Sequence, residues 1–131
     1  MKIDQLQEII NLVWEKVNLD EQWKWIDPSV LDAFDMTIDE IYESVDEYRN
    51  KNKVFLESEI WDIFWCVLRL VELLDREWAI EKDKIFDRII TKYSQRVEGL
   101  QVWTDWEQIK KSQKIELIDE QEKVNNYKSY D

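Results

Sequence analysis

The sequence predicts an all-α fold, an antiparallel bundle of about five helices. The chain has 131 residues but only one glycine and one proline, so it has few of the residues that form hairpins and tight turns. Its apolar residues recur at intervals of three and four, the period of one face of a helix, and not at the interval of two that strands show. An apolar fraction of 44% is ordinary for a globular chain, so a charged fraction of 37% does not indicate disorder.

The N-terminal third is predicted to begin with a helix over residues 3–17, which has an apolar stripe along one side. A short turn over residues 18–25 follows. Asp27 and Pro28 have the pattern of an N-cap followed by proline at the first helical position. This pattern predicts a short helix that ends at Phe34.

The middle of the chain is predicted to form two antiparallel helices. Thr37, with Glu40 three residues later, has the pattern of a capping box and begins a helix that ends near Tyr48. Residues 50–53 are polar and typical of a turn. Residues 54–74 form the most apolar segment, so we expect this helix in the centre of the bundle.

The C-terminal third is predicted to contain two more helices. One spans residues 81–97, with Gly99 as its C-cap. The other is weaker and spans residues 100–124, before a polar tail over residues 125–131 that we expect to fray. We therefore predict a helical domain over residues 1–100, followed by a C-terminal helix and polar tail over residues 101–131.

Composition excludes several kinds of site. Because Gly99 is the single glycine, neither the G-x-G-x-x-G turn nor the P-loop, which need several residues without a Cβ, can form. Without histidine there is no Ser-His-Asp triad and no H-E-x-x-H zinc helix, so acid–base chemistry falls to carboxylates or lysines. Cys66 alone supports neither a disulfide nor a four-ligand zinc site, as expected in a reducing cytosol.

The charge and the apolar runs predict a cytoplasmic chain that binds neither nucleic acid nor membrane. A net charge of −12 opposes binding to phosphate backbones and favours cations or basic partners. The longest uninterrupted apolar run, Ile63–Leu68, is far shorter than the roughly 20 residues of a membrane helix. The first ten residues contain acids and no cleavage-like small residues, so we expect no export signal.

Two pairs of acids stand out in the two central helices. Glu40 and Glu43 are three residues apart on one predicted helix, and Glu59 and Asp62 repeat that spacing on the next. Antiparallel neighbours bring the two pairs face to face, where four carboxylates repel one another and favour a divalent cation such as Mg²⁺ or Mn²⁺. Neither pair alone identifies a site in so acidic a chain. The indication comes from their order and spacing, and from the expected burial of Glu59 and Asp62.

These residues resemble a known family. The segments DEIYE at 39–43 and EIWD at 59–62, separated by 15 residues, are similar to the E-E-x-x-E and E-x-x-D signature of the MazG-like all-α nucleoside triphosphate pyrophosphohydrolases. The similarity covers roughly residues 6–100, with a tryptophan-containing stretch at 22–25. The chain departs from the family at Asp39, where the signature has glutamate. It also departs at Tyr93, where many relatives have asparagine.

The resemblance implies an Mg²⁺-dependent hydrolysis of an NTP or dNTP to the monophosphate and pyrophosphate. Glu40, Glu43, Glu59 and Asp62 are then the metal ligands, and Asp39 orients or deprotonates the attacking water. Because Asp39 is one methylene shorter than the family's glutamate, its carboxylate moves by about an ångström, an error that costs on the order of 10²-fold in rate. The resemblance also implies a homodimer or homotetramer, with which the apolar stripes left on short helices agree.

Binding of an anionic nucleotide beside carboxylates requires positive charge. The candidate phosphate-binding side chains are Arg69, Lys53, Lys92 and Arg96. Arg69 lies seven residues after Asp62, hence on the same helix face. Trp23 and Trp65 are candidates to cover or stack on the base. The alternatives are solvated surface bases for the cations, and a core or subunit interface for the tryptophans.

Two other functions remain open at this level. One is a non-catalytic acidic helical module that binds a basic protein partner. It needs carboxylates spread along an exposed surface, whereas the enzyme needs them within reach of one cation. The other is a family fold that has lost its activity, for which Asp39 and Tyr93 leave room.

Overall fold

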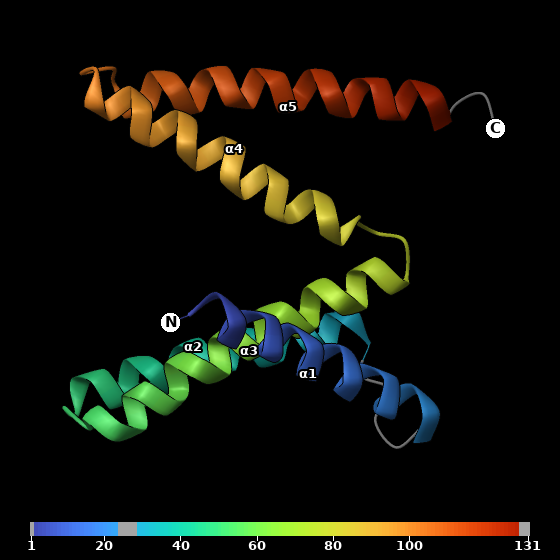
Figure 1. Ribbon diagram of the computed structural model, residues 1–131, viewed down its shortest axis with the longest axis vertical. Coiled ribbons are helices and arrows are strands. Elements are labelled where there is room, and N and C mark those ends of the chain that lie inside the picture. Colours follow the sequence, from blue (N-terminus) through green and yellow to red (C-terminus); the bar gives the residue numbers. More distant parts are fainter. Residues whose placement is uncertain (1, 24–28, 129–131) are drawn as a thin grey trace. The chain divides into compact units, whose positions relative to one another are not determined.

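The computed structural model describes residues 2–23 and 29–128, except for the side chains of Trp23 and Lys128. These residues form five helices and no strand (Figure 1), which confirms the predicted all-α class. The helices are α1 (Ile3–Trp23), α2 (Val30–Arg49), α3 (Lys53–Arg76), α4 (Lys82–Gln101) and α5 (Trp106–Lys128). In this part of the chain, no helix has an apolar stretch long enough to cross a bilayer.

Contacts along the backbone divide the chain into two compact units, Met1–Lys82 and Asp83–Asp131. The first unit contains α1, α2, α3 and the first residue of α4. The second unit contains the rest of α4 and all of α5. The predicted domain boundary after residue 100 stays a prediction, because a division of the structure into compact units does not test where a sequence domain ends.

In the first unit, α3 is the central helix, as its apolar sequence predicts. It packs against α2 and against α1. The most buried apolar side chains of this unit are Val13 and Val17 from α1, Ala33 from α2 and Cys66 from α3. The core is therefore built where α3 meets both neighbours.

The segment predicted as two short helices is one continuous helix, α2. Its N-cap is Ser29, whose Oγ accepts a hydrogen bond from the backbone N–H of Asp32 at 3.1 Å. Thr37 is therefore not a cap. It is buried in mid-helix, where its hydroxyl donates to the carbonyl oxygen of Ala33 at 2.8 Å. The predicted cap at Asp27 and Pro28 lies outside the described residues.

Three other helix ends differ from prediction. Helix α1 continues to Trp23, so the described part of the predicted turn at 18–25 is helical, helped by an i,i+4 ion pair between Lys16 and Asp20. Gly99 is not a C-cap, because it lies inside α4, where a Cβ would overlap the side chain of Ile109. Helix α5 reaches Lys128, so the tail predicted from residue 125 is partly helical.

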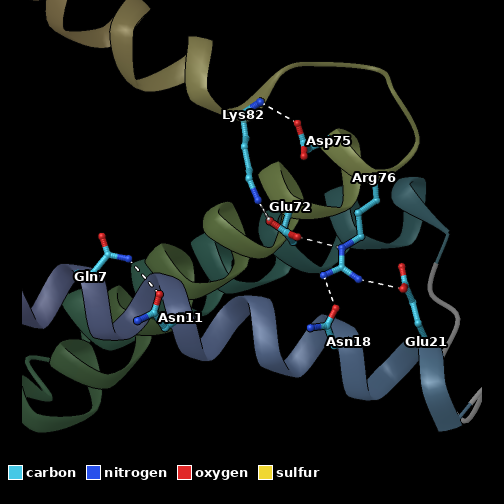
Figure 2. Close-up of polar contacts among 8 residues, drawn as sticks. All are labelled: Gln7, Asn11, Asn18, Glu21, Glu72, Asp75, Arg76 and Lys82. Carbon is cyan, nitrogen blue, oxygen red and sulfur yellow. Dashed lines mark hydrogen bonds and ion pairs between the residues drawn. The ribbon is translucent and has the colours of Figure 1, made fainter.

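Polar contacts join the end of α1 to the end of α3 (Figure 2). The Arg76 guanidinium donates to Glu72 Oε1 at 2.9 Å and to Asn18 Oδ1 at 2.6 Å, and it pairs with Glu21 at 2.9 Å. The buried carboxylate of Glu72 also accepts from Lys82 Nζ at 3.1 Å. Each charge in this group has opposite charges beside it, which offsets the cost of its burial.

Candidate metal centre

A tight turn between α2 and α3 sets the register of these two antiparallel helices. The turn contains Lys51, which has a left-handed conformation with a φ of 57°. The backbone N–H of Asn52 donates to the carbonyl oxygen of Glu47 at 3.0 Å, and its side-chain amide donates to the Glu47 carboxylate at 2.7 Å. This closed turn confirms the predicted turn and brings the acidic positions of the two helices opposite each other.

Three of the four predicted acids converge between α2 and α3. Glu40, Glu43 and Glu59 each contribute one carboxylate oxygen to a group in which all of these atoms lie within 4.8 Å of one another. Glu40 and Glu59 are partly buried and Glu43 is exposed. Such a group of oxygens suits a hard divalent cation. That it binds one stays a prediction.

The fourth acid, Asp62, differs from expectation because its side chain is exposed. Burial was expected from the apolar residues around it, and the structure does not confirm this. Asp62 is still close enough for its charge to raise the pKa of both Glu40 and Glu59. It therefore belongs to the electrostatic surroundings of the three-carboxylate group.

The electrostatics of the group favour an added positive charge. Burial, followed by the charge of Glu43, a side-chain hydrogen bond with Glu59 and the charges of Asp62 and Glu59, raises the pKa of Glu40 from its ordinary 4.5 to about 7. Burial, with the charges of Glu43 and Asp62, also raises the pKa of Glu59. One oxygen of Glu40 and one of Glu59, both Oε2, are buried without a hydrogen-bond partner among the described residues. Two unsatisfied oxygens on residues of one carboxylate group fit a cation ligand set.

Asp39, the predicted catalytic residue, is exposed on α2. It directly precedes Glu40, so it lies about a quarter of a turn around the helix from the carboxylate group. It is not one of the three converging acids. Its catalytic role stays a prediction.

Arg69 lies on the α3 face that meets α2, as its spacing from Asp62 predicts, but it is buried, with only 6% of its surface exposed. Its Nη1 lies 3.8 Å from the sulfur of Met36 on α2. No described carboxylate lies within ion-pairing distance of it. The sequence pattern did not single out Met36, because a methionine on a helix carries no signal beyond its apolar character.

Lys53 and Lys92 are exposed side chains. Lys53 is the first residue of α3 and not a loop residue, and it pairs with Glu57 at 3.6 Å. Lys92 Nζ lies 5.4 Å from the centre of the Tyr93 ring. Lys92 belongs to the second unit and Lys53 to the first. Their roles as phosphate-binding residues stay predictions.

Arg96 is buried inside the second unit. Its Nε donates to Gln113 Oε1 at 2.9 Å, and its guanidinium lies 5.4 Å from the ring of Tyr93 and 5.2 Å from that of Trp106. Gln113 in turn donates to the carbonyl oxygen of Lys92 at 2.9 Å. These contacts join α4 to α5. The partners from α5 lie beyond the sequence segment that resembles the family, so that segment gave no sign of them.

The two predicted base-contacting tryptophans remain untested. Trp65 is partly buried on α3, which is compatible with a core position. The side chain of Trp23 lies outside the described residues. Cys66 is a small buried residue of the core, as expected for a lone cysteine.

Comparison with protein families agrees with this geometry. The family model of the MazG nucleotide pyrophosphohydrolase domain matches residues 29–100, which is more than half of the chain. The chain belongs to the MazG family. The match begins at the cap of α2 and ends near the end of α4, so α1 and α5 lie outside the MazG segment. Comparisons with curated proteins and with solved structures found no match.

Proposed function

We propose that this chain is an Mg²⁺-dependent nucleotide pyrophosphohydrolase that converts an NTP or dNTP to the monophosphate and pyrophosphate. The observation that carries the proposal is the convergence of Glu40, Glu43 and Glu59 inside the MazG segment, with two buried oxygens that have no hydrogen-bond partner in the described part of the chain. Family membership supports the reaction class.

Glu40, Glu43, Glu59 and Asp62 are the residues that hold Mg²⁺, with Mn²⁺ as a substitute. When bound, the cation neutralises the carboxylates, polarises a phosphoryl oxygen and lowers the pKa of a water. Asp39 then accepts a hydrogen bond from the attacking water and orients it. Its exposed position lets it face an incoming substrate.

The clustering of the carboxylates supports an enzyme over an acidic interaction module. A module that binds a basic protein needs only exposed charge, and it gains nothing from carboxylates that converge at a cost in repulsion. The convergence is explained when a cation is the ligand. Exposed acids elsewhere on α2 are compatible with either function.

The test is pyrophosphate release from a panel of NTPs and dNTPs, with and without Mg²⁺, by wild type, Glu59→Gln and the control Glu57→Gln. Glu57 is an exposed acid of α3 that lies two residues before Glu59. We expect Mg²⁺-dependent release that Glu59→Gln lowers by at least about 100-fold. Mutation of a residue that only hydrogen-bonds to a metal ligand lowers metal affinity or activity by about 10- to 100-fold, and loss of a ligand itself should cost at least as much. The control keeps its activity.

A second arm uses Asp39→Asn. We expect this variant to lose turnover while Mg²⁺ still raises its melting temperature, because the ligand set is intact. Unchanged turnover would exclude Asp39 as the water-orienting residue. The absence of release from every nucleotide, with no stabilisation by Mg²⁺, would overturn the proposed activity and favour the interaction module.

A further inference from the structure

Arg69 is a buried arginine that has no counterion among the described residues. Only 6% of its surface is exposed, and the single hydrogen-bond acceptor recorded for its guanidinium among the described residues is the Met36 sulfur at 3.8 Å. A thioether is a weak acceptor, and an arginine side chain stays protonated in proteins. Burial of such a charge without a partner is costly. A bound anion that pairs with the guanidinium explains why the charge is buried here.

Arg76, on the same helix, shows which partners a partly buried structural arginine has in this protein. Its guanidinium contacts Glu72, Glu21 and Asn18 at 2.6–2.9 Å (Figure 2). All three contacts lie within the first unit; those to Glu21 and Asn18 join α3 to α1, and the one to Glu72 lies within α3. Arg69 has no comparable set among the described residues. The two arginines therefore form a matched pair for experiment.

The position of Arg69 links it to the carboxylate group. Met36, its contact on α2, lies one helical turn before Glu40, and Cys66 lies one turn before Arg69 on α3. Both the carboxylates and Arg69 affect the pKa of the buried Cys66 thiol. Burial and the charges of Glu40 and Asp62 raise this pKa, while the charge of Arg69 lowers it. The guanidinium and the carboxylates thus lie along one α2–α3 interface.

We propose that Arg69 binds a phosphate group of the nucleotide, and of the pyrophosphate product, whose other oxygens face the cation held by the carboxylate group. This inference rests on the proposed function. Helical side chains lean toward the N-terminus of their helix, which directs Arg69 toward Asp62. The planar guanidinium offers two parallel N–H donors that match two phosphate oxygens.

Met36 covers Arg69 in the absence of substrate. Its side chain is 45% exposed, although its sulfur contacts the buried guanidinium. Methionine is flexible and adapts to irregular surroundings, so its displacement uncovers Arg69 without movement of the helices. A nucleotide phosphate then replaces the sulfur as the partner of the guanidinium.

The experiment compares Arg69→Met with Arg76→Met, which remove the same charge from the same helix. Two quantities are measured: the melting temperature without ligand, and the Kd for inorganic pyrophosphate in the presence of Mg²⁺. We expect Arg69→Met to melt at or above the wild-type temperature, because it removes an unpaired buried charge. We expect its Kd to rise at least about tenfold, the effect of losing hydrogen bonds to a charged group. Arg76→Met melts lower and keeps its Kd.

The outcomes separate this inference from the proposed activity. If the wild type hydrolyses nucleotides and Arg69→Met keeps both its KM and its Kd for pyrophosphate, Arg69 is not a phosphate ligand and the activity stands. A lower melting temperature with an unchanged Kd also overturns the inference, because Arg69 is then structural. If the wild type hydrolyses nothing but binds pyrophosphate through Arg69, the phosphate site stands and the activity fails.

Discussion

Glu40 is held in an environment that disfavours its charge. It is partly buried on α2, opposite Glu59, and one of its carboxylate oxygens has no hydrogen-bond partner within residues 2–23 and 29–128. Burial and three neighbouring acids raise its pKa to about 7. An ionisable side chain whose charged form is disfavoured in the ligand-free protein is typical of a ligand-binding site.

This raised pKa makes the stability of the metal-free protein depend on pH. The folded state keeps a proton on Glu40 that the unfolded chain releases above pH 4.5, so stability must fall as pH rises from about 4.5 to about 7. The slope is at most about 1.4 kcal/mol per pH unit, and solvent screening at this partly exposed site lowers it. Urea unfolding in EDTA at several pH values measures this slope.

Glu40→Gln is the control for this prediction. The variant carries no charge at position 40, so its stability should change less between pH 5 and pH 7 than that of the wild type. Mg²⁺ competes with the proton for the same oxygens, so its stabilising effect on the wild type should grow over that range. A wild-type curve that rises with pH in EDTA would contradict the assigned pKa.

Three buried or partly buried arginines show how strongly context determines the role of one residue type. Arg76 is ion-paired between α1 and α3, and Arg96 stacks on Tyr93 and Trp106 in the second unit. Arg69 alone has a sulfur in place of an anion or an aromatic ring. Both Arg69 and Arg96 were predicted to bind phosphate, Arg69 from its spacing and Arg96 from the resemblance to the family. Their surroundings now distinguish them.

At the scale of elements, α2 presents three chemically distinct sides. The side that meets α3 carries small or hydroxylated residues, which allow close approach of the two helices; these are Ala33, Thr37 and Ser44. The Ser44 hydroxyl is satisfied within the helix by donating to the carbonyl oxygen of Glu40 at 2.9 Å. The large apolar residues of α2 lie on a second side and the aspartates on a third. Close packing of α2 on α3 is what brings the carboxylates together.

The helix ends are made without glycine. Lys51, Trp78 and Trp103 follow α2, α3 and α4 with φ values of 57°, 62° and 61°, a left-handed conformation that is costly for residues with a Cβ. The single glycine lies inside α4, where it makes room for Ile109. Each of these three ends therefore stores backbone strain.

Lys51→Gly should stabilise the protein by about 0.5–1 kcal/mol. Glycine removes the steric cost at a φ of 57°, and this gain exceeds the extra entropy that glycine brings to the unfolded chain. The midpoint of urea unfolding measures the change. Ser58→Gly, an exposed position inside α3, is the control and should lose a similar amount. A loss of stability in Lys51→Gly would contradict this account of the turn.

At the scale of the whole molecule, charge is distributed unevenly along the chain. Residues 1–82 contain 20 acidic and nine basic side chains, whereas residues 83–131 contain ten and nine. Nearly all of the net charge of −12 therefore belongs to the unit that contains the carboxylate group. A negative potential around this unit attracts cations.

We expect a homodimer in solution, with a second copy of the chain on α2. Six apolar side chains at alternating intervals of three and four follow one side of α2 and are 38–73% exposed: Leu31, Phe34, Ile38, Ile41, Val45 and Tyr48. This spacing is that of a helix-pairing seam. Together they expose on the order of several hundred Å², a substantial share of the roughly 800 Å² per partner in a stable interface. Light scattering measures the mass.

Ile41→Asp should convert the dimer to a monomer, because it places a charge in the middle of the seam. Tyr42→Asp is the control, since it introduces the same charge one residue further around α2, outside the seam. A monomeric wild type at micromolar concentration, or an Ile41→Asp variant with the wild-type mass, would contradict this interface.

Much of the fold and part of the candidate site follow from local pattern. The scarcity of glycine and proline and the period of the apolar residues determine an all-α chain, and the polar turn at 50–52 makes α2 and α3 antiparallel. Helical spacing then places Glu40 and Glu43 opposite Glu59. The helical class, the turn and the spacing within each helix depend on sequence neighbours within one or two turns, so the sequence by itself determined them; the packing of α2 on α3 completed the carboxylate group.

Tertiary structure decided how far each helix is rotated toward its neighbours. Packing along α3 also leaves Asp62 exposed while it buries Arg69 beside Met36, although the two share a helix face, and the packing of α4 and α5 places Arg96 against Gln113. The rotation of α2 leaves its apolar seam exposed, although the pattern of this seam alone is that of a core face. The helical period shows which residues share one side of a helix, but it does not show which side packs against another helix. That choice depends on the packing of residues far apart in the chain, which local periodicity does not encode.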